Sequence, residues 1–204
     1  MKSLIFAATI VLAAGLASAP AFASVEAGDM MVRGRLLGVV PDESATTSIG
    51  GSVDINSQYV PEVDFTYFAT KHIGIEVIAG VTPHKVHHTP SGTDLGKVWL
   101  LPPTVTVQYH FNPDGKVKPY VGAGVNYTHF FNADAGALSN VNYKDTWGWA
   151  LQAGVDYQLN DHWYLNADVK KIKIEPDVSF NNGAVTAAVK INPWIIGIGA
   201  GYKF

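Results

Sequence analysis

The chain has 204 residues, of which 48% are hydrophobic and 15% charged, so it is too apolar to be disordered and long enough for one domain or a small pair. Globular chains carry about 25% charged residues, and the lower share here suggests a surface that does not all face water. The net charge of −3 offers no field for gripping a nucleic-acid backbone, and the absence of cysteine excludes disulfides, thiolate nucleophiles and cysteine-bound metals.

The first 23 residues predict an export signal. Lys2 supplies the positive charge, residues 4–16 form a continuous apolar stretch, and Ala21-Phe22-Ala23 match the small-x-small cleavage pattern. A membrane-anchoring helix is the alternative, but the stretch is shorter than the roughly 20 residues needed to span a bilayer. Cleavage after Ala23 predicts a mature domain over 24–204, and cleavage after Ala19 stays open.

The rest of the chain alternates with a period of two, which is typical of β-strands. From Trp147 to Tyr157 the odd positions carry mostly large apolar residues and the even positions small or polar ones. No segment after the signal has the apolar length of a transmembrane helix. The alternation predicts eight strands, at 29–40, 57–70, 73–87, 98–111, 118–132, 144–159, 162–175 and 186–204.

The connections between these strands alternate in length. Three have the composition of tight turns: 71–72, 112–115 and 160–161. Four are longer and rich in Ser, Thr, Asn and Gly: 41–56, 88–97, 133–143 and 176–185. An even number of antiparallel strands with short periplasmic turns and longer extracellular loops is the plan of an all-β, eight-stranded transmembrane barrel in the outer membrane of a Gram-negative-type envelope.

Alternation alone leaves a soluble sandwich or lipocalin-like barrel as the rival, because it does not say whether the apolar face meets a core or lipid. Aromatic spacing favours lipid. Three pairs stand ten residues apart on the same parity: Trp99 and Tyr109, Trp147 and Tyr157, Trp194 and Phe204. Ten residues span roughly 33 Å, which a tilt near 40° shortens to about 25 Å, the height of the lipid-facing band between aromatic girdles.

Inward parity places charges of both signs in the lumen. These are Arg33, Arg35, Glu62, Asp64, Glu76, Asp156, Asp168 and Lys203. Buried charges are tolerated when they are paired or wet, so we expect a plug-like network of ion pairs that seals the periplasmic half, with a purely structural role as the alternative. Eight strands also leave no room for a water-filled channel of the porin kind.

Pro102 and Pro103 stand in the fourth expected strand, where two consecutive residues without N–H cannot continue a ladder. They predict a bulge or a gap in the barrel wall near the outer half of the membrane. Our hypothesis is a lateral exit for an apolar ligand, and the alternative is a bend that only shapes the extracellular rim. The residues expected to line the exit with the two prolines are Trp99, Leu100, Leu101, Ile78 and Phe130.

Histidines raise the question of a metal or catalytic site. A strand would point His87 away from His84 and His88, so we expect a solvated loop rather than a metal site there. His110 and Asp156 lack a hydroxyl nucleophile in a strained turn, so we expect neither an enzyme nor a cofactor.

Four blocks of the sequence resemble the OmpW (outer membrane protein W) family of small eight-stranded barrels. They are Leu101 to Tyr109, Pro119 to Thr128 with Phe130-Phe131, Asp145 to Tyr157, and Asn192 to Phe204. The resemblance implies passive conduction of small hydrophobic molecules, which leave sideways through the barrel wall. By analogy with outer-membrane barrels, the final aromatic Phe204 implies recognition by the outer-membrane assembly machinery. The alternatives are a structural, adhesive or stress-related barrel and a narrow channel for small polar or cationic solutes. Because closure removes sheet edges, we expect a monomer in outer-membrane lipid.

One stretch departs from the family. Lys170 and Lys171 stand where relatives commonly carry aromatic residues, and Ile172 and Ile174 follow Val169 out of step. This predicts a β-bulge, or a strand that rises beyond the bilayer at this point. A lysine in the lumen would also make the interior more polar.

Overall fold

The computed structural model describes residues 24–48, 51–89, 91–137 and 140–204, so the expected signal at 1–23 lies outside it. Within these ranges the regular structure is β, apart from one short 3-10 turn, η1 (Asn181–Gly183). The same ranges contain no helix long and apolar enough to cross a membrane.

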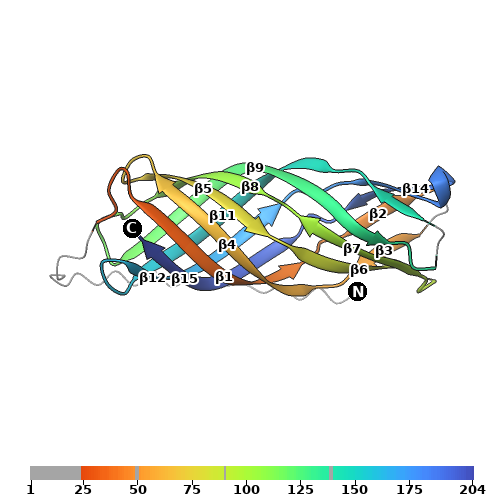
Figure 1. The fold of residues 1–204 in the computed structure, drawn as a ribbon, viewed down its shortest axis with the longest axis horizontal. Coiled ribbons are helices and arrows are strands. Elements are labelled where there is room, and N and C mark those ends of the chain that lie inside the picture. Colours follow the sequence, from red (N-terminus) through yellow and green to blue (C-terminus); the bar gives the residue numbers. More distant parts are fainter. Residues whose placement is uncertain (1–23, 49–50, 90, 138–139) are drawn as a thin grey trace.

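Eight antiparallel strands close into a barrel, as the sequence predicted (Figure 1). They are β1 (Met30–Val40), β4 (Gln58–Phe68), β5 (Ile73–Gly80), β8 (Thr104–His110), β9 (Val117–Asp134), β11 (Thr146–Gln158), β12 (Trp163–Ile172) and β15 (Trp194–Lys203). Each pairs with its neighbour along the chain, β15 pairs with β1, and the sheet therefore has no free edge at this level.

Short turns join the strands at one end of the barrel, where the C-terminus also lies (Figure 1). They connect β4 to β5, β8 to β9 and β11 to β12. In the last of them the Asn160 side chain accepts hydrogen bonds from the backbone N–H groups of His162 and Trp163, which is how asparagine stabilises a tight turn. This end matches the predicted periplasmic rim.

At the other end the barrel continues into an outer extension built from seven further strands. They are β2 (Ser44–Thr47), β3 (Ser52–Ile55), β6 (Thr82–Thr89), β7 (Asp94–Leu101), β10 (Val141–Tyr143), β13 (Asp177–Phe180) and β14 (Val185–Lys190). Here the wall divides into two sheets, β10-β13-β14-β2 on one side and β9-β7-β6-β3 on the other.

The extension corrects the expected loops at 41–56, 88–97, 133–143 and 176–185, because these stretches contain or lie largely within strands. Ser, Thr and Asn gave them the composition of loops. Their inward positions, such as Val53, Ile55, Val178 and Phe180, are nevertheless apolar and buried, and this packing stabilises strands that propensity alone does not favour.

Around the barrel proper, burial is the reverse of that in a soluble protein. On β4, Glu62, Asp64 and Thr66 are buried, whereas Val63 and Phe65 are exposed on the outer face. Trp147 and Ile198 are more than three-fifths exposed, at 71% and 64%. A continuous apolar belt of this kind is stable when hydrocarbon surrounds it, so the barrel requires a lipid environment.

The alternation of buried and exposed residues also runs unbroken through β12 and beyond it. Asp168, Lys170, Ile172 and Ile174 are all buried. The expected β-bulge in this strand is therefore wrong, and the alternative, a strand that rises beyond the bilayer at this point, stays a prediction. What changes at Ile172 is the character of the lumen, which passes from polar to apolar while the same positions keep facing inward.

Candidate functional site

A charged plug fills the lumen at the level of the barrel proper. Arg33 is its central member, and its guanidinium donates to Asp64 at 3.0 Å, to Asp156 at 2.9 Å and to Thr66 at 2.8 Å. Arg35, two residues along the same inward face of β1, donates to Glu62 at 2.8 Å and to Glu76 at 3.1 Å. Bidentate and shared contacts of this kind hold a planar guanidinium in one orientation.

Lys170 joins the plug to a further carboxylate. Its ammonium lies 2.8 Å from Glu62 and 2.9 Å from Asp168, and the Tyr120 hydroxyl donates to the other Asp168 oxygen at 3.1 Å. The structure thus brings seven of the eight expected luminal charges into one network. Lys203 stands apart at the short-turn rim, where it donates to Asp29.

The inner-face glycines make room for these long side chains. A Cβ added at Gly154 would come within 2.4 Å of the Tyr120 ring, and one at Gly201 within 3.1 Å of the Arg33 side chain. The plug therefore packs against bare backbone. Its members are buried and mutually paired, with side chains filling the lumen at this level.

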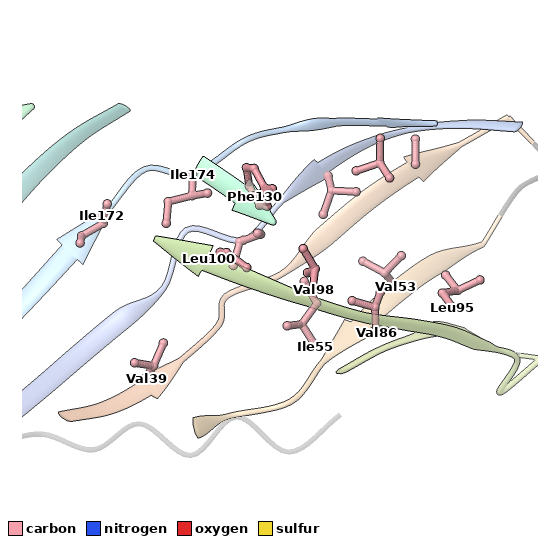
Figure 2. Close-up of a cluster of buried hydrophobic side chains, with 14 of the residues drawn as sticks. Val39, Val53, Ile55, Val86, Leu95, Val98, Leu100, Phe130, Ile172 and Ile174 are labelled. Carbon is pink, nitrogen blue, oxygen red and sulfur yellow. The ribbon is translucent and has the colours of Figure 1, made fainter. Parts of the chain in front are cut away.

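Above the plug, the outer extension encloses a cavity of about 330 Å³, which we call the cup. Its wall is mostly aliphatic, and Figure 2 shows side chains of this cluster, among them Val53, Val86 and Leu95, gathered between the strands. The polar lining residues are Thr47, His84, His88, Ser91, Thr93 and Tyr143. Burial raises the pKa of Tyr143 to about 12, so this phenol is neutral. The volume lies in the range of small-molecule sites.

A second, smaller cavity of about 40 Å³ lies between the cup and the plug. Both cavities are lined by His84, Leu100 and Ile191, which we call the neck. Glu62, a member of the plug, lines the inner cavity. A volume close to that of one water molecule means that an organic solute could enter only if the neck side chains moved.

Pro102 and Pro103 divide the strand expected at 98–111 in two, between the end of β7 and the start of β8. The expected bulge is wrong, because the register with β9 is the same on both sides of the prolines. Tyr127 N–H still donates to Pro103 at 3.1 Å, and the Asn126 amide donates to the Pro102 carbonyl at 3.2 Å. On this side the wall stays closed.

On the other side the ladder is interrupted. The pairing of β5 with β8 stops at Ile78–Thr104, and the pairing of β6 with β7 begins at Thr82–Leu100. The neighbouring pairing of β4 with β5 stops at Glu62–Gly80, and the pairing of β3 with β6 begins at Ile55–Val86. Four prolines flank these interruptions, Pro61, Pro83, Pro102 and Pro103, and together with Gly80 and Val81 we call them the proline window.

The residues expected around the exit divide between two faces. Ile78, Leu100 and Phe130 are buried inside the barrel, and Ile78 and Leu100 line the inner cavity with Pro102. Trp99 and Leu101 are half-buried. The expected girdle residues Tyr109, Trp147, Tyr157, Trp194 and Phe204 are exposed on the outside. Trp99 differs from them, because it lies in the outer extension beside Phe131.

The histidine-rich segment is strand rather than the solvated loop that we expected. His84 is buried in β6 and lines both cavities, and His88 lines the cup. The period of two explains the difference, since His84, Val86 and His88 in β6 continue the inward face of β5. Of Lys170 and Lys171, it is Lys170 that shares the parity of Asp168 and faces the lumen, and its pairing with Glu62 and Asp168 was not expected.

The two sheets of the extension separate at two places, which we call seams: one lies between β2 and β3 and the other between β9 and β10. Side chains bridge both seams. At one seam Ala45 N–H donates to the Ser52 hydroxyl. At the other the Asp145 carboxylate lies 2.7 Å from His129 Nδ1 and accepts hydrogen bonds from the Tyr127 hydroxyl at 2.8 Å and the Phe130 N–H at 3.0 Å. These bonds to His129, Phe130 and Tyr127 lower the pKa of Asp145 to about 2.

We expect Asp145→Ala to loosen the second seam, so that amide hydrogen exchange of β10 and of Phe130 becomes faster in lipid. Because the folded pKa is depressed, the contribution of Asp145 is present above the value for a free carboxyl, about 3.9, and is lost as the pH falls through about 2. After correction for intrinsic rates, protection should therefore persist at pH 4. Asp177→Ala, which removes an exposed carboxylate near Lys144, is the control. Equal exchange in both variants would contradict the role of Asp145.

Comparison with known proteins finds the OmpW family model matching residues 26–204. Outer membrane protein W of Escherichia coli is 38% identical over 218 residues that cover all of both chains. A dibenzothiophene metabolism operon protein of Pseudomonas aeruginosa is 31% identical and covers 76% of each chain. The crystal structure of the outer membrane protein OprG of Pseudomonas aeruginosa superposes with a TM-score of 0.84 at 30% identity, over 89% of this chain and 98% of that one.

Proposed function

The chain belongs to the OmpW family of outer-membrane β-barrels, and we propose that it admits small apolar molecules by passive diffusion and releases them sideways through its wall. The observation that carries the proposal is a mostly apolar cup that lies above a charged plug, with the inner cavity between them. A solute that enters from outside meets an apolar cavity first and a buried ion-pair network next.

Entry is favourable because the cup replaces water around an apolar solute with aliphatic side chains, at about 25 cal/mol per Å² of apolar surface. The plug then stops axial movement, since passage would separate ion pairs such as Arg33–Asp156 and Arg35–Glu62 inside the barrel. An apolar solute in the inner cavity thus has more to gain from the surrounding hydrocarbon than from the periplasmic half of the lumen.

The proline window is the exit that we propose. Pro102 and Gly80 line the inner cavity, and the ladder is interrupted on both sides of Val81. Unpaired backbone facing hydrocarbon is costly, which makes such an interruption a feature with a function. The related operon protein named for dibenzothiophene metabolism supports an apolar substrate class for this family of barrels.

A reversible lock tests the exit. The ladder ends at Ile78–Thr104, and continuing its register by one residue would bring Ala79 opposite Pro103. We therefore expect Ala79→Cys with Pro103→Cys to form a disulfide that closes the window, and the native chain offers no competing cysteine. In cells that lack the native protein, oxidation should reduce uptake of an apolar probe such as ethylbenzene several-fold, toward the level of cells without the barrel. A reductant should restore it.

The matched control is Val77→Cys with Val105→Cys, a directly paired and outward-facing position in the intact ladder. Its disulfide should leave uptake unchanged. Full uptake by the oxidised Ala79/Pro103 variant would eliminate the lateral route. Appreciable ion conductance in single-channel recordings without uptake of the apolar probe would favour a narrow polar channel instead.

A further inference from the structure

His84 is the one neck residue with a polar side chain, beside Leu100 and Ile191. It is only 3% exposed, and every solute that passes from the cup to the inner cavity passes it. A buried polar group at a neck whose other two residues are aliphatic has to be satisfied or carries a cost. What His84 offers to a passing solute therefore bears on which solutes are preferred.

A single hydrogen bond fixes the state of this imidazole. Nδ1 lies 2.9 Å from the backbone oxygen of Asn56. A carbonyl oxygen only accepts, so Nδ1 carries the proton and the neutral ring keeps its lone pair on Nε2. Burial lowers the pKa of His84, which favours the neutral ring.

Nε2 is left without a donor. Within the described ranges of the chain, the bond to Asn56 is the hydrogen bond that His84 makes. Since Nδ1 is attached to the wall, Nε2 on the opposite edge of the ring is the atom turned to the lumen. Thr82 and Thr104 also line the inner cavity, but within the described residues neither hydroxyl is hydrogen-bonded to Nε2, and Thr104 donates to the Pro102 carbonyl instead. Val86, Leu100 and Ile191 have no side-chain donor.

We propose that His84 Nε2 is a hydrogen-bond acceptor that makes the passage selective for apolar molecules carrying one hydroxyl, such as phenols and alkanols, over their pure hydrocarbon counterparts. This rests on the proposed function and narrows its substrate class. The hydroxyl donates to Nε2 while the apolar body stays against Leu100 and Ile191. A hydrocarbon of the same shape passes the neck but leaves Nε2 unsatisfied.

Paired probes test the proposal. Uptake of labelled 4-ethylphenol and of ethylbenzene is measured in cells that express the full chain, with the uptake of cells lacking it subtracted. We expect His84→Phe to lower the ratio of phenol to hydrocarbon uptake by about two- to tenfold, the effect of losing one hydrogen bond. His84→Gln, which keeps an acceptor oxygen, should recover part of the ratio.

The control is His87→Phe, because His87 lies in the same strand but lines neither the cup nor the inner cavity. It should leave the ratio unchanged, and heat-dependent electrophoretic migration should show that all variants fold. If the native barrel raises ethylbenzene uptake but His84→Phe does not move the ratio, the role of His84 is refuted and the proposed function stands. If the barrel raises the uptake of neither probe, the proposed function itself fails.

Discussion

Replacing Arg33 by alanine is expected to destabilise the folded barrel by about 3–5 kcal/mol, because removing one partner of a buried ion pair leaves the other charge uncompensated. Arg33 is fully buried and is the group that Asp64 and Asp156 share. Without it, Asp64 keeps only its ion pair with Arg35 and Asp156 keeps only the Asn166 amide as a donor, in a lumen that side chains fill. The Thr66 hydroxyl loses the donor that it has in Arg33. Urea unfolding in lipid vesicles, followed by heat-dependent electrophoretic migration, measures the loss.

Lys71→Ala is the matched control for this prediction. Lys71 also pairs with a carboxylate, Asp114 at 3.4 Å, but both side chains are largely exposed at the short-turn rim. Exposed pairs contribute about 0–1 kcal/mol. If Arg33→Ala were as mild as Lys71→Ala, the plug would be a wet and loosely held cluster, and the argument that it blocks the axial route would fail with it.

The parity of the sequence was enough to predict the plug, because the barrel forces every second residue inward. Parity alone assigned to the lumen two residues of β1, Arg33 and Arg35, and two of β4, Glu62 and Asp64. No contact had to be known. Parity does not give the register between strands that are distant in sequence. The pairing of Arg33 with Asp156, or of Lys170 with Glu62, depends on that register and on the closure of the barrel.

The outer extension was missed because composition and parity disagreed there. Ser44 to Thr47 and Ser52 to Ile55 contain the polar residues of a loop, yet their strands form because Val53 and Ile55 pack inside the cup. The cup could not be predicted from the sequence either, because the strands that form its wall were expected to be loops. His84 lies within the expected strand at 73–87, but the histidine cluster was interpreted as a solvated loop, although the even spacing of His84, Val86 and His88 indicated an inward face.

Ile191→Trp is expected to reduce uptake of an apolar probe to nearly that of cells without the barrel. Ile191 is buried at the neck and lines both cavities. The inner cavity of about 40 Å³ has no space for an indole, so the larger side chain must occupy the passage. Overpacking of this kind costs about 1–3 kcal/mol, which is less than the loss expected for Arg33→Ala, so the barrel should still fold.

Ile196→Trp separates obstruction from misfolding. Ile196 lies five residues further along the same terminal segment, but its side chain is 60% exposed on the lipid-facing side, where an indole is well tolerated. The same substitution thus narrows the passage at one position and only enlarges the outer surface at the other. Uptake lost at Ile191 and kept at Ile196 would mean that solutes travel through the neck. Uptake kept in both would mean that they reach the membrane by a path outside the lumen, in which case neither the proline window nor His84 could control it.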